Sequence, residues 1–321
     1  MDLEPSRDQG QPVIAPILWT LLSFGLLFWG AERLVKGGAG MALRLGLTAL
    51  VVGLTVVAYG TSSPELLVSV KAAWVGQSGI AVGNVIGSNI FNVAVILGIA
   101  ALIRPIKVQK SVIMRDGPVM VGVTLAGLAV LWDGSVSRIE GGLLVVASIV
   151  YTVWIIRAAR KEPNDDDEGL KALSIGKAVF FIVAGLAILA LGSRVLVENA
   201  VIIAKSVGVS EAVIGLTIIA AGTSMPELAT SAVGALRGHS DIALGNVVGS
   251  NIFNILFVLG LASVIHPIEN AAVRPVDQWF VLGTAAILVP MMWTSKMVGR
   301  KEGAVLLISY GAYLWLMWPK G

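Results

Sequence analysis

The chain has 321 residues, of which 56% are hydrophobic and only 13% are charged, and its mean hydropathy is +0.86. A soluble domain usually carries about 25% charged residues, so this composition excludes an ordinary soluble protein and indicates a multi-pass membrane protein. The net charge of +3 gives no indication of nucleic-acid binding, because the basic residues lie in loops between apolar runs. The absence of cysteine excludes disulfides and thiolate metal sites.

We interpret ten apolar runs as membrane spans, since about 20 helical residues cross the hydrocarbon core of a bilayer. The expected spans are residues 13–36, 48–74, 79–103, 116–132, 138–157, 174–205, 210–236, 242–265, 276–293 and 303–318. We therefore predict an all-α membrane protein with ten transmembrane helices. The second span is unusual, because Pro64 breaks it near its middle and a carboxylate, Glu65, follows at once.

A single long charged connection divides the chain. This linker, residues 158–173, separates a first unit of five spans, residues 1–157, from a second, residues 174–321. Because five is odd, the second unit enters the membrane from the opposite side. We therefore expect helices 2 and 7 to be the corresponding broken helices of an inverted repeat.

The two units repeat each other in sequence at a constant offset of 162 residues. The stretch AYGTSSPEL (58–66) returns as AAGTSMPEL (220–228), and IAVGNVIGSNIFN (80–92) returns as IALGNVVGSNIFN (242–254). Without a gap, residues 48–106 and 210–268 are identical at 32 of 59 positions. Inverted repeats are common in secondary transporters, whose substrate site lies near the membrane midplane between the copies.

The first motif places Glu65 and Glu227 at equivalent depths. A carboxylate inside the membrane costs several kcal/mol unless it has a partner or a water-filled cavity. Each follows Gly-Thr-Ser-x-Pro, which favours a broken helix, because proline lacks a backbone donor and the hydroxyls bond locally. We expect free carbonyls at residues 58–60 and 220–222. Together these groups would form an oxygen cage suited to calcium, which takes about six to eight oxygens, or to sodium.

The second motif adds neutral oxygens on one helix face. Ser88 and Asn92 are four residues apart, and Ser250 and Asn254 repeat them. For Asn84 and Asn246, which lie one turn earlier, we expect packing or backbone satisfaction rather than direct ligation. Both motifs also have plainer interpretations, a hinge at the break and packing between helices by Ser and Asn. Two inverted copies, each with an acid at the same depth, favour ion binding.

The remaining acids have other expected functions. Glu140 and Glu302 fall in the first turn of a helix, where a carboxylate suits the dipole, so we interpret them as structural. Glu32 and Glu198 are expected to face an interface or the margin of a cavity. The acidic run at residues 165–168 lacks EF-hand spacing and is interpreted as a solvated linker rather than a regulatory calcium site.

The distribution of basic residues predicts the orientation. With the N-terminus outside, 16 of the 23 Lys and Arg residues fall on the inner side, which is the side that basic loops favour. We expect a multi-pass protein of the cell membrane, embedded in the lipid bilayer, with both termini outside and the linker in the cytoplasm.

The paired motifs GTSxPEL and GNxxGSNIFN resemble the alpha repeats of the cation/calcium exchanger superfamily, and most closely its prokaryotic sodium/calcium exchanger branch. The resemblance implies that helices 2, 3, 7 and 8 surround a row of cation sites and that helices 1 and 6 form a sliding gate. It implies that Glu65 and Glu227 are carboxylate ligands shared by calcium and sodium. The other implied ligands are backbone carbonyls of Thr61, Thr223, Ala58 and Ala220, and hydroxyls of Ser62, Ser224, Ser88 and Ser250.

One departure from the pattern affects the expected ions. Sodium/calcium exchangers with these motifs often carry Asp at one of the positions held here by Asn92 and Asn254. With Asn at both, the cage has two formal negative charges, which one calcium or two sodium ions balance. We expect a calcium/sodium antiporter without a prosthetic group.

Other functions remain open on the sequence. A proton/calcium antiporter using the same two glutamates is the main alternative, and a channel or a non-transporting cation sensor is another. An enzyme is not expected, because the sequence shows no pairing of a buried nucleophile with histidine, and no nucleotide motif indicates a primary pump. The oligomeric state is not indicated.

Overall fold

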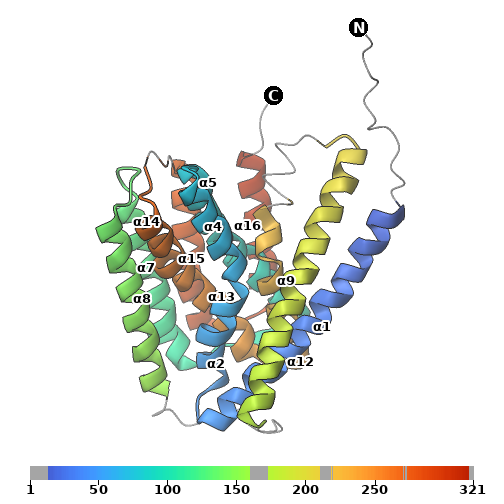
Figure 1. Cartoon of the computed structure of the whole chain (residues 1–321). Helices are drawn as coiled ribbons and strands as arrows, with labels where there is room; N and C mark the ends of the chain where they lie inside the picture. The colour runs from blue at the N-terminus through green and yellow to red at the C-terminus, as the bar shows by residue number, and fades with distance from the viewer. Residues whose placement is uncertain are drawn as a thin grey trace.

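The computed structural model describes residues 14–159, 173–209, 218, 220–269, 271 and 273–317. The fold is predominantly helical, as predicted (Figure 1). In the described part, seven helices are long and apolar enough to cross a membrane, and an eighth is added when the bent pair 49–61 and 63–74 counts as one span. Of the other two predicted spans, 210–236 is described continuously only from residue 220, and 303–318 corresponds to an 18-residue helix that begins with three charged residues.

The described elements follow the two repeats. Those of the first repeat are α1 (Ile14–Leu45), α2 (Ala49–Val52), η1 (Gly53–Val57), α3 (Ala58–Thr61), α4 (Ser63–Trp74), α5 (Ser78–Phe91), η2 (Asn92–Leu97), α6 (Gly98–Ile103), β1 (Ile106–Lys107), η3 (Val112–Asp116), α7 (Gly117–Val130) and α8 (Arg138–Ala159). Those of the second are α9 (Ile175–Ser206), α11 (Ala220–Thr223), α12 (Met225–Arg237), α13 (Ser240–Phe253), η5 (Asn254–Leu259), α14 (Gly260–Ile265), α15 (Pro275–Ser295), β2 (Met297–Val298) and α16 (Arg300–Met317). Here η denotes a π-helical segment. The acidic run 165–168 lies outside the described residues.

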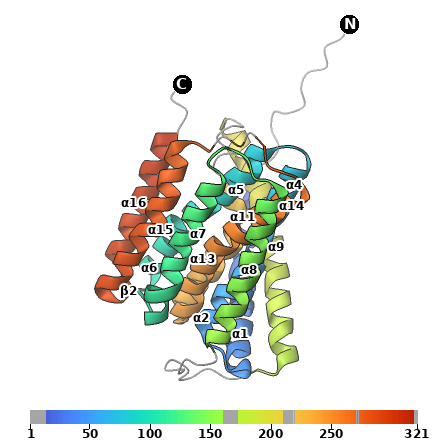
Figure 2. The same ribbon diagram turned by 90° about the vertical axis from the view of Figure 1, so that its left-hand side faces the viewer.

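Two short backbone pairings demonstrate the inverted repeat. Ile106 of β1 pairs antiparallel with Val298 of β2, and Val136 forms an isolated bridge with Ile268. The repeat-equivalent of Ile106 is Ile268, and that of Val298 is Val136, so each pairing is the counterpart of the other at the offset of 162 residues. β1 and β2 lie at the lower end of the bundle in Figure 2, whereas the loops after α7 and α14 meet at the upper end. The all-α prediction therefore omitted one two-stranded sheet of two residues per strand, which ties the loops together.

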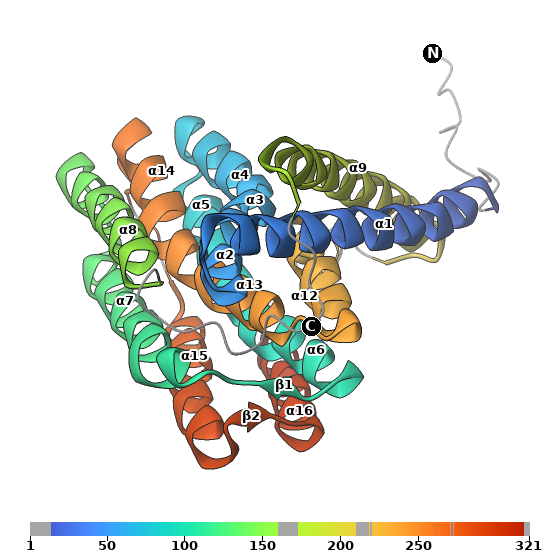
Figure 3. The same cartoon turned by 90° about the horizontal axis from the view of Figure 1, so that it is seen from below.

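Helices α1 and α9 stand beside the rest of the bundle and lean against each other (Figures 1 and 3). Each has 32 residues, or about 48 Å at 1.5 Å per residue, which exceeds a hydrocarbon core of about 30 Å. Their backbones approach closely, since a Cβ added at Gly185 would lie 2.7 Å from the Leu34 nitrogen. The helix continues past residue 36, the predicted end of the first span, to Leu45.

The segments that contain the second motif form the centre of the protein. In the spans 78–103 and 240–265, 78% of the most apolar window is buried, against 28–39% in the other helices that are long and apolar enough to cross a membrane. Figure 3 shows α5 and α13 between α4, α12, α7 and α15. α13 packs on the backbone of α2 and η1, where a Cβ at Gly249 would lie 2.5 Å from the Leu54 carbonyl oxygen. Only glycine permits this approach.

The equivalent acids at the starts of α8 and α16 cap their helices. Glu140 accepts hydrogen bonds from the backbone nitrogen of Ser137 at 2.8 Å and from its hydroxyl at 2.7 Å. Glu302 accepts one from the backbone nitrogen of Gly299 at 3.0 Å. These bonds satisfy donors that have no partner within the helix. The structural interpretation of both glutamates is therefore confirmed.

Candidate cation site

Both predicted helix breaks are present. The axis bends by 46° between the segments 49–61 and 63–74, and Ser62, at the bend, has φ −81° and ψ 10°. Ser224 has nearly the same dihedrals, φ −88° and ψ 9°, between α11 and α12. In both cases the proline lies in the first turn of the following half-helix, where its missing donor is tolerated. The break therefore turns the chain and leaves the glutamate in the first turn of a new helix.

Free carbonyls were predicted before each break, and this prediction was wrong for several of them, which accept hydrogen bonds in the structure. The carbonyl of Ala58 accepts a bond from the backbone nitrogen of Ser62 at 3.0 Å. The carbonyl of Tyr59 accepts one from the Ser63 hydroxyl at 3.1 Å, and that of Ala221 accepts one from the Ser224 nitrogen at 3.2 Å. Continued backbone bonding and a serine side chain satisfy these oxygens. Ligation by the Ala58 carbonyl therefore stays a prediction.

The two glutamates are held by serines of the opposite repeat. Glu65 and Glu227 are 0% and 1% exposed. The Ser224 hydroxyl donates to Oε1 of Glu65 at 2.7 Å, and the Ser62 hydroxyl donates to Oε1 of Glu227 at 2.8 Å. Ser88 reaches the same oxygen of Glu65 at 3.4 Å. These crossed bonds place both carboxylates at the interface between the repeats.

Five oxygens of the predicted ligands are buried without a hydrogen-bond partner among the described residues. They are Oε2 of Glu65, Oε2 of Glu227, Oδ1 of Asn92, Oδ1 of Asn254 and Oγ of Ser250. A buried acceptor without a partner costs about 1–3 kcal/mol, and more when it is charged. The set consists entirely of hard oxygen atoms, which is the donor chemistry that calcium and sodium prefer.

Asn84 and Asn246 donate hydrogen bonds to the backbone carbonyls of the two glutamates. The Asn84 amide nitrogen donates to the Glu65 carbonyl at 3.0 Å and to the Ser69 hydroxyl at 2.9 Å. Asn246 repeats both contacts in the second half, to the Glu227 carbonyl at 3.3 Å and to the hydroxyl of Ser231 at 3.0 Å. The expectation that these two amides satisfy backbone groups is thus confirmed.

The other predicted ligands are distributed around the break. Thr61 is fully buried, and its hydroxyl lies 3.0 Å from the amide oxygen of Asn246. Thr223 is half-buried. Ala220 begins α11, and its side chain lies outside the described residues. Thr230, one turn after Glu227, was missed from the sequence, although its buried hydroxyl also lacks a partner among the described residues.

Asn92 and Asn254 each begin a π-helical segment, η2 and η5. Such widened turns often occur at functional sites. Their amide nitrogens are bound by two asparagines that the sequence interpretation missed, Asn251 and Asn89 respectively. The motif GSNIFN contains two asparagines in each repeat, so Asn89 and Asn251 could have been noticed in the sequence. The sequence does not reveal that they contact the opposite repeat.

The sequence model of the family described as sodium/calcium exchanger protein matches residues 15–157 and 177–318, one match for each repeat. The chain belongs to this family. The exchanger is 39% identical to the putative antiporter CaxA of Alkalimonas amylolytica, over 95% of this chain and 99% of that one. It is 32% identical to the sodium/calcium exchanger MaX1 of Methanosarcina acetivorans, over 92% and 96% of the two chains.

Solved structures of the sodium-calcium exchanger NCX_Mj have the same fold. One of them, soaked with sodium and strontium, superposes with a TM-score of 0.83 at 30% identity and covers 94% of this chain and 98% of its own. The resemblance stated from the motifs is therefore confirmed. Its family makes the exchanger a membrane antiporter of the cation/calcium class rather than an enzyme.

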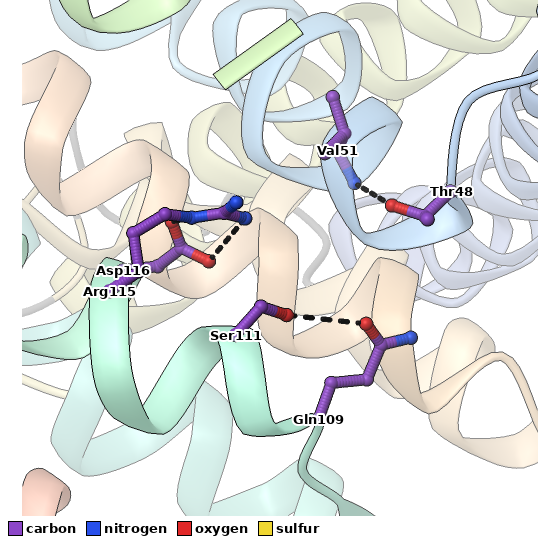
Figure 4. A network of polar contacts seen from close by, with 6 residues as sticks. All are labelled: Thr48, Val51, Gln109, Ser111, Arg115 and Asp116. Atoms are coloured by element: carbon purple, nitrogen blue, oxygen red, sulfur yellow. Dashed lines mark hydrogen bonds and ion pairs between the residues drawn. The ribbon is translucent and has the colours of Figure 1, made fainter. Parts of the chain in front are cut away.

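A third buried carboxylate among the described residues lies at the end of the bundle where α2 begins (Figure 4). Asp116 is 0% exposed and pairs with Arg115 at 2.9 Å, within the π-helical segment η3. Nearby, the Thr48 hydroxyl accepts from the Val51 nitrogen and caps α2. In the sequence, residue 116 is predicted only as the start of a span. Because its neighbour along the chain neutralises it, Asp116 adds no uncompensated charge to the exchanger.

Proposed function

We propose that this exchanger moves calcium in one direction and sodium in the other through one site that includes Glu65 and Glu227. The observation that carries the proposal is the set of five buried oxygens without partners, two of them on carboxylates that serines of the opposite repeat hold in place. Bound cations would supply the partners that these oxygens lack. The printed names of MaX1 and NCX_Mj, which describe sodium and calcium exchange, support these ions.

The charge of the site determines the expected stoichiometry. No group of three or more acidic, histidine or cysteine side chains that could hold a metal occurs within the described residues, so Glu65 and Glu227 alone supply the formal charge of −2. One calcium ion or two sodium ions neutralise it. A third sodium ion would leave a net positive charge in a low-dielectric site, which is costly.

The same charge explains why exchange is obligatory. When the cage holds no ion, it contains two buried negative charges, and occluding it from both sides of the membrane would leave them uncompensated. Only a neutralised cage crosses between the inward-open and outward-open forms. Calcium and sodium compete for the same carboxylates, so release of one ion requires binding of the other. In this alternating-access mechanism α1 and α9 form the gate that slides across the core.

A proton/calcium antiporter is the second candidate. It is favoured by the neutral side chains at residues 92 and 254, because two protons neutralise two glutamates as well as one calcium ion does. Sodium is placed first because the printed names of MaX1 and NCX_Mj specify it.

The test is calcium-45 uptake by the purified full chain in proteoliposomes. Uptake is measured with an outward sodium gradient, with an outward proton gradient, and with neither. Uptake driven only by sodium supports the proposal, and uptake driven only by protons assigns the chain to the second candidate. Uptake that needs no counter-ion gradient indicates a channel, and calcium binding without any uptake indicates a sensor. Both results contradict antiport.

We also propose that both termini lie outside and that the linker is cytoplasmic. The N-terminal end of α1 and the C-terminal end of α16 lie toward one side of the molecule, whereas α8 ends and α9 begins at the other (Figure 1). Because the chain has no cysteine, a single Asp166→Cys variant tests this directly. A membrane-impermeant maleimide should label it in inside-out vesicles and not in intact cells, and labelling of intact cells contradicts the proposed orientation.

A further inference from the structure

Four asparagines form a closed network between the two repeats. Asn89 donates its amide nitrogen to the Asn251 backbone carbonyl at 3.0 Å, and Asn251 donates to the Asn89 carbonyl at 3.3 Å. Asn92 donates to Oδ1 of Asn251 at 3.0 Å, and Asn254 donates to Oδ1 of Asn89 at 3.1 Å. Each bond has its counterpart at the repeat-equivalent position. All four side chains are at most 2% exposed.

This network determines which way the amides of Asn92 and Asn254 point. A side-chain amide has one oxygen and one nitrogen of similar size, so its hydrogen-bond partners decide its orientation. The partner offered to Asn92 is the oxygen of Asn251, which accepts only. Turning the Asn92 amide over would place two acceptors about 3.0 Å apart in a buried site, which is unfavourable. The Asn254 amide is constrained in the same way by Asn89.

The fixed orientation leaves one oxygen of each amide for another partner. Oδ1 of Asn92 and Oδ1 of Asn254 are buried and have no partner among the described residues. Asn92 follows Ser88 by four residues, and Ser88 touches Glu65. Asn254 follows Ser250, whose hydroxyl is also without a partner in the part of the chain that the structure describes. The unpartnered amide oxygens therefore belong to the same region as the glutamates.

We propose that Asn89 and Asn251 are positioning residues that orient Asn254 and Asn92, respectively, as neutral oxygen ligands of the transported calcium ion. This inference rests on the proposed function of the site. It assigns a function to two side chains that do not touch the ion themselves. It also makes a crossed dependence explicit, because the residue that orients a ligand belongs to the opposite repeat.

The network is better matched by Asn than by an ionised Asp at both ligand positions. An ionised carboxylate at residue 254 would have no donor for Oδ1 of Asn89, and the two oxygens would repel each other. The same holds for residue 92 and Asn251. A neutral amide supplies this donor in each repeat, and with Asn at both positions the formal charge of the cage stays at −2.

A double-mutant cycle tests the crossed dependence, because it isolates the coupling between two side chains. Calcium-45 binding to the purified full chain is measured by equilibrium dialysis. We expect Asn89→Leu to weaken calcium binding by about 10- to 100-fold, the usual effect of removing a group that orients a metal ligand. In an Asn254→Ala background the same substitution should change binding by less than about threefold, since the ligand it orients is already absent.

The matched control is Asn89→Leu in an Asn92→Ala background. Asn92 is bound by Asn251 and not by Asn89, so the loss caused by Asn89→Leu should remain close to that in the unaltered chain. A purely structural function of Asn89 in helix packing would give equal losses in both backgrounds, and that result overturns the inference. If Asn89→Leu does not fold, Asn251→Leu, compared in Asn92→Ala and Asn254→Ala backgrounds, tests the same claim with the pairing reversed.

The result also separates this inference from the proposed function. Calcium binding by the unaltered chain, with equal losses in the two backgrounds, removes the positioning function and leaves the antiporter proposal intact. Absence of calcium binding by the unaltered chain overturns both. A loss that depends on Asn254 and not on Asn92 supports both.

Discussion

The two repeats are nearly interchangeable at the cation site and differ at its surroundings. Around the carboxylates, the serine-to-glutamate distances are 2.7 and 2.8 Å in the two directions, and the asparagine network is symmetric. At α1 and α9, the helices proposed to form the gate, the halves differ. Glu32 of α1 forms an ion pair with Arg237 of α12, whereas the residue equivalent to Glu32, Arg194 of α9, pairs with Glu198 four residues along its own helix.

This difference separates two requirements on an antiporter. The site must bind the same ions when it opens to either side, which favours equivalent ligands from both inverted copies. The gate need not be symmetric, because an unequal set of contacts only changes the relative populations of the two forms. The comparison therefore predicts equal effects for paired substitutions of the carboxylates and of their serine donors, and unequal effects for paired substitutions where the contacts of the two repeats differ.

The largest effect is expected from removing either carboxylate. Glu65→Gln and Glu227→Gln each leave one uncompensated buried charge, a loss of about 3–5 kcal/mol, or more than about 100-fold in affinity. Calcium-45 uptake should be abolished to the same extent by both. Glu140→Gln and Glu302→Gln, which alter the repeat-equivalent caps, are the matched controls and should retain uptake. Normal exchange by either site variant contradicts the site assignment.

The next effect tests the crossed serines. Ser62→Ala removes a donor to Glu227, and Ser224→Ala removes a donor to Glu65. A hydrogen bond to a charged group contributes about 1.5–3 kcal/mol, so each variant should weaken calcium binding by about 10- to 100-fold. Equilibrium dialysis with calcium-45 should give similar values for the two. A large loss in one and none in the other would show that the site is functionally asymmetric.

The fold could be predicted from the sequence largely because its signals are local. Apolar runs placed the span at 242–265 within two residues of the observed segment at 240–265, and the duplicated motifs located both helix breaks. The helix that contains the first span continues past the predicted end at residue 36, through Gly37, to Leu45. In the structure, a Cβ at Gly37 would lie 2.9 Å from the Ala178 carbonyl oxygen, so this glycine extends the contact between α1 and α9.

For the candidate site, the sequence predicted which residues take part but not how they pair. The motifs identified Glu65, Glu227 and the asparagines at 92 and 254, because acids and amides inside apolar spans are unusual. They did not show that Ser62 binds Glu227 rather than Glu65, or that Asn89 holds Asn254. Such pairings depend on how one repeat packs on the other, which neither repeat specifies alone. The error about free carbonyls has the same origin, since motif chemistry does not show which groups find local partners.

A smaller effect distinguishes the two serines of the second motif. Ser88 lies 3.4 Å from Oε1 of Glu65, whereas the Ser250 hydroxyl is buried without a partner among the described residues. Burying an unpaired hydroxyl costs about 1–3 kcal/mol. In the absence of ions, Ser250→Ala should therefore raise the free energy of unfolding by about 1 kcal/mol and Ser88→Ala should lower it by about the same amount. Thermal unfolding in detergent measures both, and equal shifts would contradict the asymmetry.

The smallest effect concerns the proposed gate. The side chains of Arg237 and Glu32 are 51% and 34% exposed, and such a pair contributes about 0–1 kcal/mol. Because it links α1 to α12 in only one repeat, Arg237→Gln should shift the balance between the two access forms by up to about fivefold. The measurement is the ratio of half-saturating calcium concentrations at the two faces of oriented vesicles. Arg194→Gln, which breaks a pair confined to α9, is the control and should leave that ratio unchanged. If both variants move the ratio equally, the ion pair between α1 and α12 does not set the balance.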